Sequence, residues 1–405
     1  MELGTRFQMP TETAQASSSV FFLMFVIFSG AAITATLALY ARQAMLIGYI
    51  VLGIALGPWG LQWITEQDAP RIKDIAHIGI VFLLFLLGLN LKPESLLRTL
   101  GQTTFVTIAS SLIFGIVGVV IGVVFGYDLK ESIIIGVSMI FSSTILGLKL
   151  LPTTVLHHKR TGGILISILL FQDLIAILML LILKGLNQGG IPLVDIALSM
   201  LSLPLLAGFA WAFGRYVLLN IIMQFSKIQE YIFLTAIGWC LGMAELAEHF
   251  KLSHEIGAFL AGIVLATSPI ALFIAESLKP LRDFFLVMFF FSLGAGLNLN
   301  ILPDVMLPAI ILAALMLALK APTFSFLFRK SGEPEKHTLE MGWRLGQISE
   351  FSLLIAVLAQ DMKVISPNAS YLIQVATLLT FMFSSYFIVM NYPSPIAVSD
   401  KLRRD

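Results

Sequence analysis

The stretch from Gly163 to Leu181, GILISILLFQDLIAILMLL, decides the fold class of this chain. It is apolar and long enough to cross a bilayer as a helix, which takes about 20 residues. Phe171-Gln172-Asp173 lies at its centre, and an ionisable group at that depth costs about 2.5–3.5 kcal/mol on insertion scales. We therefore expect Asp173 to have a buried partner or a function that outweighs this cost.

The composition of the chain identifies a polytopic membrane protein. Of its 405 residues, 58% are hydrophobic and 12% are charged, whereas a soluble protein is about 25% charged. A net charge of +1 gives no indication of nucleic-acid binding. Cys240 is the single cysteine, so an internal disulfide is excluded. The polar tail 1–18 lacks the basic start of a cleaved signal peptide, so we expect an uncleaved first span.

The predicted fold is all-α, with about 13 transmembrane helices of the length that a bilayer requires. The expected spans are 19–40, 44–63, 76–92, 103–126, 131–151, 162–184, 192–222, 229–248, 254–274, 283–299, 303–328, 339–360 and 368–391.

The predicted orientation follows from Lys and Arg in the short loops, which gather on the cytoplasmic side. With the N-terminus outside, the inner loops hold about twice as many as the outer ones. The odd number of spans then leaves the C-terminus in the cytoplasm. One expected inner loop, at 275–282, carries Lys279 and Arg282.

Two short segments recur at nearly the same offset along the chain. Gly53–Leu56 (GIAL) resembles Gly262–Leu265 (GIVL), and Gly88–Leu91 (GLNL) recurs as Gly296–Leu299. The offsets of about 209 and 208 residues predict two repeats of six spans. Because one extra span separates them, the repeats enter the membrane from opposite sides. This is the inverted-repeat architecture of secondary transporters.

Polar residues interrupt two expected spans at matching positions in the two repeats. Ser142, Ser143 and Thr144 interrupt the fifth span. The polar, glycine-containing segment GQISEFS, with Gln347, Ser349 and Glu350, interrupts the twelfth. Paired interruptions of this kind are typical of transport sites, where freed carbonyls and hydroxyls replace water around a cation. The alternative is that the hydroxyls bond back to their own helices.

Lys320 is the second costly charge, because it lies within an apolar run that continues to Phe328. A lysine near a helix end reaches for the interface, but the residues beyond Lys320 favour a deeper position. We expect Asp173 or Glu350 to be its partner. Glu350 has a second interpretation, in which it offsets the positive end of a broken helix.

Asp173 is either a member of a permanent buried ion pair or the group that carries the transported ion. A carboxylate that binds a proton and a cation in turn is sufficient for antiport, because the two compete for the same oxygens. We favour this role and expect Asp173 to bind the transported monovalent cation. Gln172 cannot ionise, so its carbonyl either ligates the ion or forms a hydrogen bond.

The sequence carries no enzyme signature. His254-Glu255 lacks the second histidine of HExxH, and no GxSxG or phosphate-binding loop is present. We expect no cofactor. His157 and His158 lie beside two basic residues in an expected inner loop and are read as solvated.

A combination of motifs resembles the KefB/KefC branch of the monovalent cation:proton antiporters over roughly residues 40–390. The matching segments are Phe171-Gln172-Asp173, Gly257–Gly262, Phe289–Phe291 before Gly294, Gly346-Gln347 with Ser349-Glu350-Phe351, and Leu56–Leu61.

The resemblance implies a division into scaffold and core, with the fifth and twelfth spans broken and crossing. The scaffold mediates homodimerisation, and the core moves against it. In this scheme Asp173 binds ion and proton beside Gln172, and Lys320 pairs with Asp173. The implied segments are a polar tail (1–18), scaffold helices 1–3 (19–101), core helices 4–6 (102–190), a linker helix (191–228), scaffold helices 8–10 (229–300), core helices 11–13 (301–392) and a cytosolic tail (393–405).

We therefore expect a homodimeric K+/H+ antiporter of the inner (plasma) membrane, with Na+ as the alternative ion. Members with two adjacent acids exchange unequal charge, so Gln172 favours an electroneutral cycle. Potassium-efflux members usually continue into a cytosolic nucleotide-binding domain, which makes a regulatory domain or subunit outside these 405 residues an implied partner. The alternatives are a ligand-gated, channel-like K+ efflux system, a sensor that has lost transport, and a Na+-coupled symporter of organic solutes.

Overall fold

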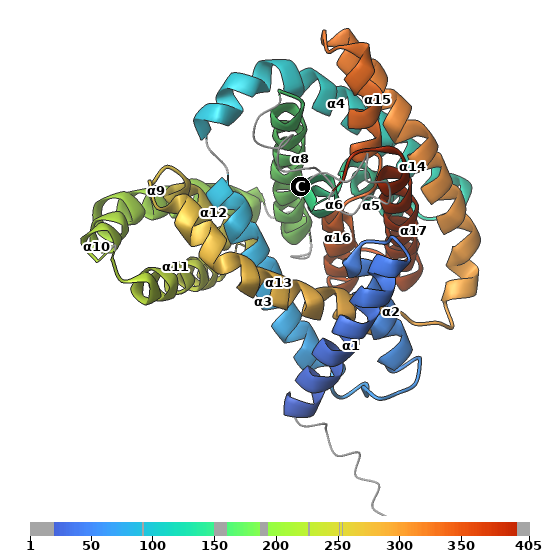
Figure 1. Ribbon diagram of the computed structural model, residues 1–405, viewed down its shortest axis with the longest axis horizontal. Coiled ribbons are helices and arrows are strands. Elements are labelled where there is room, and N and C mark those ends of the chain that lie inside the picture. Colours follow the sequence, from blue (N-terminus) through green and yellow to red (C-terminus); the bar gives the residue numbers. More distant parts are fainter. Residues whose placement is uncertain are drawn as a thin grey trace, which may run out of the picture.

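The computed structural model describes residues 20–90, 93–149, 160–186, 193–225, 227–250, 252 and 254–394. These residues form helices joined by short turns (Figure 1). The tail 1–18, most of the tail 393–405, and His157 and His158 lie outside the described residues, so the expectations for them stay predictions.

The described helices follow the expected spans closely. They are α1 (Val20–Tyr40), α2 (Met45–Leu56), α3 (Ala69–Asn90), α4 (Pro93–Val124), α5 (Leu129–Ile140), α6 (Thr144–Lys149), α8 (Arg160–Leu186), α9 (Leu193–Phe213), the π-helical turn η1 (Gly214–Leu218), α10 (Leu219–Gln224), α11 (Gln229–His249), α12 (His254–Ala266), α13 (Ala271–Ala295), α14 (Leu302–Lys330), α15 (Glu335–Arg344), α16 (Glu350–Asp361) and α17 (Pro367–Asn391).

Within the described part of the chain, seven helices have the length and composition to cross a membrane, and shorter apolar helices such as α2 and α12 accompany them. The all-α membrane architecture is therefore confirmed. The number of 13 spans stays a prediction, because the shorter and broken helices do not meet the length criterion by themselves.

The expected inner loop at 275–282 is wrong. This segment is helical, because α13 begins at Ala271 and runs through Pro280. One pair of charges has the i, i+3 spacing that suits a helix surface, with Lys279 Nζ 3.7 Å from Glu276. The side of the membrane on which this segment lies stays a prediction.

Glycines bring α2 and α13 together backbone to backbone. A Cβ atom at Gly53 would collide with the carbonyl oxygen of Phe291, and one at Gly294 would collide with that of Ile50. A side chain at either glycine would therefore separate the two helices.

A second crossing of the same kind joins α3 to α12. A Cβ atom at Gly88 would collide with the Phe259 carbonyl, and one at Gly262 with the Phe85 carbonyl. In the predicted repeat, α12 corresponds to α2, and α13 corresponds to α3. The crossing of α2 with α13 therefore corresponds to the crossing of α12 with α3. An inverted repeat is expected to produce such a matching pair of contacts.

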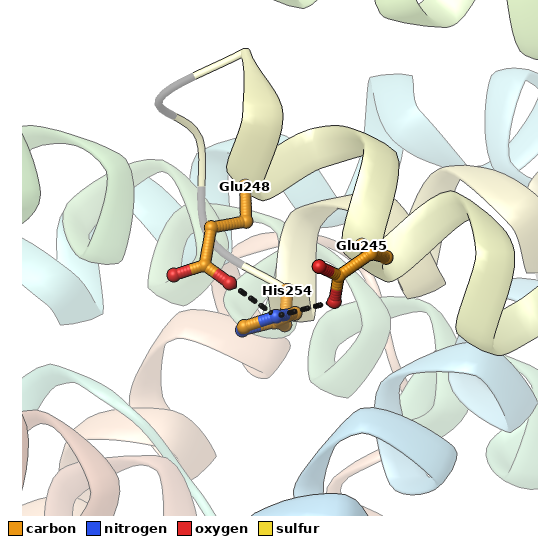
Figure 2. Close-up of side chains that lie close together, drawn as sticks. All are labelled: Glu245, Glu248 and His254. Atoms are coloured by element: carbon orange, nitrogen blue, oxygen red, sulfur yellow. Dashed lines mark ion pairs between the residues drawn. The ribbon is translucent and has the colours of Figure 1, made fainter.

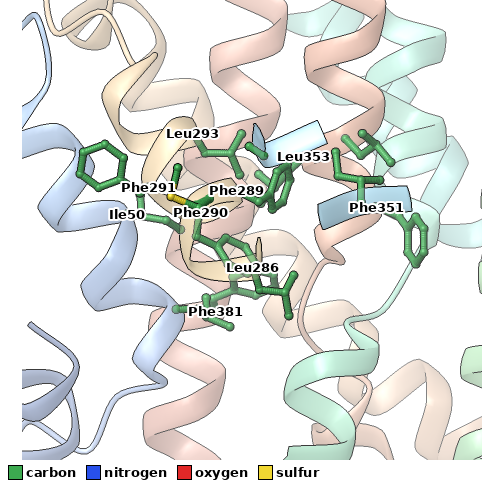
Figure 3. Packing of buried hydrophobic residues seen from close by; sticks show 14 of the residues in the cluster. Ile50, Leu286, Phe289, Phe290, Phe291, Leu293, Phe351, Leu353 and Phe381 are labelled. Carbon is green, nitrogen blue, oxygen red and sulfur yellow. The ribbon is translucent and has the colours of Figure 1, made fainter. Parts of the chain in front are cut away.

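The helices pack in two groups that follow the predicted scaffold and core. Helices α1 to α3 pack with α11 to α13, whereas α4, α5 and α8 pack with α14 to α17 (Figure 1). Between the groups lies an apolar cluster, in which Phe289 and Phe290 of α13 meet Phe351 of α16 and Phe381 of α17 (Figure 3). The domain boundaries themselves stay predictions.

Candidate ion-binding site

Two helix breaks and the middle of α8 form the candidate site. The first break, 141–143, separates α5 from α6, and Phe141 there has an extended backbone (φ −82°, ψ 149°). The second break, 345–349, separates α15 from α16, and Ser349 is likewise extended (φ −99°, ψ 155°). Both expected interruptions are therefore real breaks in the helices.

Asp173 is buried in the middle of α8, with 1% of its surface exposed. The hydroxyl of Thr144, the first residue of α6, lies 3.0 Å from its Oδ2 and 3.2 Å from its Oδ1. After donating, the Thr144 hydroxyl keeps lone pairs that can still accept, and the carboxylate keeps further acceptor sites. The structure thus brings together the carboxylate and one hydroxyl of the first break.

Gln172 is fully buried and bridges the first break. Its Oε1 accepts a hydrogen bond from the Ser142 backbone N–H at 3.0 Å, and its Nε2 donates to the Ile140 carbonyl at 3.3 Å. These are backbone groups that the end of α5 leaves without helical partners. Of the two roles expected for Gln172, the structure shows hydrogen bonding.

Gln347 lies within the second break and bonds to its ends. Its Nε2 donates to the Arg344 carbonyl at the end of α15 (2.9 Å), and its Oε1 accepts from the Ser384 hydroxyl (3.1 Å). The same Nε2 also lies 3.4 Å from the Ser143 carbonyl of the first break. Gln172 therefore forms hydrogen bonds with the backbone at the first break, and Gln347 does so at the second.

Direct hydrogen bonds join the two breaks to each other. The Ser142 hydroxyl donates to the Leu345 carbonyl at 2.8 Å. The Ser143 hydroxyl accepts from the Leu146 N–H at 3.1 Å and so caps the start of α6. Ser142 and Ser143 are therefore occupied by backbone partners, and Thr144 is the hydroxyl of this group that reaches Asp173.

Lys320 does not have the partner that the sequence predicts. Its ammonium donates to the Phe141 carbonyl (2.6 Å) and to the Gln347 carbonyl (3.2 Å), one in each break. It also lies 5.2 Å from the centre of the Phe114 ring. Among the described residues, neither Asp173 nor Glu350 forms an ion pair with it. The reason is that a broken helix ends in free carbonyls with partial negative charge, which attract a buried cation.

Glu350 and Ser349 form the start of α16. The Ser349 hydroxyl accepts from the Phe351 N–H at 3.1 Å, and Glu350 lies in the first turn, where a negative charge complements the helix dipole. Glu350 is 5% exposed and lines a small cavity with Leu83 of α3 and Phe289 of α13. It therefore lies at the boundary between the two helix groups.

Several members of this network were absent from the sequence-based list. The Ile348 N–H donates to the Thr380 hydroxyl (3.1 Å), and the Ser352 hydroxyl donates to the Ser138 carbonyl. The carbonyls of Phe141 and Leu345 also take part, and carbonyls have no sequence signature. The buried polar residues of α17, such as Thr380 and Ser384, were the signal available in the sequence.

The comparison with known families shows which family this chain belongs to. The family described as "Sodium/hydrogen exchanger, transmembrane" matches residues 16–390. This chain belongs to that sodium/hydrogen exchanger family. Its fold is similar to that of the sodium proton antiporter MjNhaP1 from Methanocaldococcus jannaschii, with a TM-score of 0.66, 18% identity, and coverage of 91% of this chain and 95% of that one. The predicted antiporter-like fold is confirmed.

Two relatives define its position among the exchangers. The chain is 29% identical over 373 residues to the glutathione-regulated potassium-efflux system protein KefC of Salmonella typhimurium, covering 90% of this chain and 59% of that protein. It is 28% identical over 354 residues to the iron transporter MagA of Paramagnetospirillum magneticum, covering 86% and 80%. The predicted KefC resemblance is confirmed, and the chain spans less than two thirds of the KefC length.

Proposed function

We propose that this protein exchanges a monovalent cation for a proton across the membrane, with Asp173 binding each in turn. The observation that carries the proposal is the buried Asp173 carboxylate facing the Thr144 hydroxyl, where α6 begins after the first break. A proton and a cation cannot occupy the same carboxylate oxygens together. Binding of one therefore releases the other, which is the coupling that antiport requires.

K+ is the favoured cation, and Na+ is the alternative. The described donors around Asp173 are oxygens, which suit hard cations. A single carboxylate matches the charge of a monovalent cation, which favours such an ion over the iron named for the MagA relative. The KefC relative supports K+.

An elevator-type movement is the mechanism we favour. The apolar cluster between α13 and α16 offers a boundary along which the helices α4–α8 and α14–α17 slide as a unit (Figure 3). The hydrogen bonds between the two breaks, such as Ser142 to Leu345, keep the site intact within that unit. Alternating access then comes from movement of this helix group against the other, which carries the site from one side of the membrane to the other.

The cycle is proposed to be electroneutral, with one proton for one monovalent cation. A second acid next to Asp173 would allow two protons to bind. Gln172 holds that position, and both ends of its amide are engaged with the first break. Asp173 is then the single exchanging charge of the pair.

We propose a homodimer in the inner (plasma) membrane, with the N-terminus outside and the C-terminus in the cytoplasm. A cytosolic regulatory domain or subunit is a further proposed partner, because the chain matches 59% of the KefC length. The proposed orientation follows from the loop charges.

The test is proton flux in proteoliposomes with K+, Na+, Rb+ and Li+ supplied in turn, recorded together with membrane current. The proposal predicts cation-driven proton movement without net current, largest with K+. A current carried by K+ without proton movement would instead support the channel-like efflux system. Uptake of an organic solute with Na+ would support the symporter.

A further inference from the structure

A second group of chemically active side chains lies outside the candidate ion-binding site, at the turn between α11 and α12. Glu245 and Glu248 are one helical turn apart near the end of α11, and His254 is the first residue of α12 (Figure 2). Their ligand atoms all lie within 4.8 Å of one another. The proposed transport mechanism uses none of these three residues.

One nitrogen of the His254 ring faces both carboxylates. His254 Nε2 lies 2.6 Å from Glu248 Oε2 and 3.5 Å from Glu245 Oε2 (Figure 2). A single ring N–H satisfies one carboxylate well, so the second carboxylate is close but poorly bonded. A metal ion bonded at about 2.0–2.2 Å in tetrahedral geometry separates its ligand atoms by about 3.3–3.6 Å. The 3.5 Å between His254 and Glu245 fits that range. The 2.6 Å between His254 and Glu248 is shorter, and rotation of the Glu248 side chain lengthens it to complete the site.

The backbone and a neighbouring ring hold the histidine in position. The His77 ring of α3 packs edge-on against the His254 ring, with centroids 5.7 Å apart. His77 is itself held by Glu255, whose carboxylate lies 2.8 Å from its Nε2. Three helices thus fix the ligands, whereas 81% of the Glu245 side chain and 53% of the Glu248 side chain remain exposed. The two carboxylates therefore lie at the protein surface, where the chain turns from α11 into α12.

We propose that Glu245, Glu248 and His254 bind a divalent transition metal of the Zn²⁺ class. An imidazole nitrogen with two carboxylates is a ligand set for Zn²⁺ and its neighbours, with water at the open position. Ca²⁺ and Mg²⁺ prefer six or more oxygen ligands, which this group does not supply. The bound metal joins the end of α11 to the start of α12 and so stabilises this part of the scaffold.

The test is titration of the purified protein with ZnCl₂ alone by isothermal calorimetry, using a protein without a histidine tag. We expect one ion per chain, a rise in melting temperature with Zn²⁺, and visible d–d absorption of the tetrahedral type when Co²⁺ is used. Each of Glu245→Gln, Glu248→Gln and His254→Gln should weaken binding by at least about 10–100-fold, the range seen when even supporting groups are lost. The two Glu→Gln variants keep the side-chain shape at exposed positions, and His254→Gln replaces the ring at a partly exposed position with a neutral polar chain.

The matched control is His249→Gln, which removes an exposed histidine from the same end of α11 and should leave Zn²⁺ affinity unchanged. MgCl₂ is the control for simple attraction to negative charge. The proposal is overturned if Zn²⁺ does not bind, if His254→Gln binds as tightly as the parent, or if Mg²⁺ binds equally well. In those cases the group is an ion pair centred on His254 only.

Discussion

The Lys320 ammonium lies 2.6 Å from the carbonyl oxygen of Phe141, the first residue after α5. A second bond reaches the Gln347 carbonyl, so one buried charge holds both helix breaks. Asp173 is therefore held by Thr144 and not by the lysine. The positive charge of Lys320 stabilises the backbone carbonyls of the two breaks. The Asp173 carboxylate therefore remains available to bind the transported ion.

Lys320→Met is expected to destabilise the protein independently of Asp173. Each carbonyl left without its partner costs about 1–3 kcal/mol. The measurement is a double-mutant cycle of melting temperatures with Lys320→Met, Asp173→Asn and the pair. Groups that do not interact add within about 0.3–0.5 kcal/mol, whereas a direct ion pair produces a coupling of about 0.5–3 kcal/mol. Strong coupling would contradict this result and support the Lys320–Asp173 ion pair that the sequence predicts.

Gln172→Leu is expected to lower the melting temperature. The leucine fills a similar volume but leaves the Ser142 N–H and the Ile140 carbonyl without their amide partner, at about 1–3 kcal/mol for each buried group. Thermal unfolding in detergent measures the change. The control is Gln224→Leu at the exposed end of α10, which should have little effect. Equal melting temperatures for the two variants would contradict the bridging role of Gln172.

Thr144→Val is expected to raise the KM for the cation. The substitution keeps the shape of the side chain and removes the hydroxyl that lies 3.0 Å from Asp173 Oδ2. A hydrogen bond to a charged group contributes about 1.5–3 kcal/mol, which corresponds to roughly 10–100-fold in affinity. Thr144→Ser keeps the hydroxyl and serves as the control in cation-dependent flux assays. An unchanged KM in Thr144→Val would show that the Thr144 hydroxyl does not contribute to cation binding.

A cross-link between α3 and the end of α16 is expected to stop transport. Lys73 Nζ and Asp361 Oδ2 are 2.7 Å apart and exposed, on opposite sides of the boundary between the helix groups. Lys73→Cys and Asp361→Cys are joined by a bifunctional methanethiosulfonate, which forms a disulfide with each thiol, and this bridge prevents sliding. Native Cys240 is buried and does not meet the reagent. Activity should return after reduction.

The control for this cross-link is the pair Glu276→Cys and Lys279→Cys, both on α13. A bridge there lies within one helix and should leave transport unchanged. Full activity of the Lys73–Asp361 cross-linked protein would argue against movement of one helix group along the other.

The sequence predicted the broken helices and the buried carboxylate because both depend on side-chain types. Ser142 to Thr144 and Gln347 to Ser349 are polar in apolar spans, and Asp173 is a charge in another. The partners of Lys320 were not predictable, because backbone carbonyls are exposed by the breaks and not by any residue type. The group around His254 was also missed, since Glu245, Glu248 and His254 fit no short motif and meet only when α11 and α12 fold back on each other.

The most direct test of the account is cation-driven proton flux in proteoliposomes that contain Asp173→Asn. Asparagine keeps the shape of the buried side chain but neither ionises nor exchanges a proton. Asp304→Asn, at an exposed position in the first turn of α14, is the matched control. The account predicts that Asp173→Asn abolishes exchange while the control retains it. Exchange retained by a folded Asp173→Asn protein would contradict the assignment of Asp173 as the carrier.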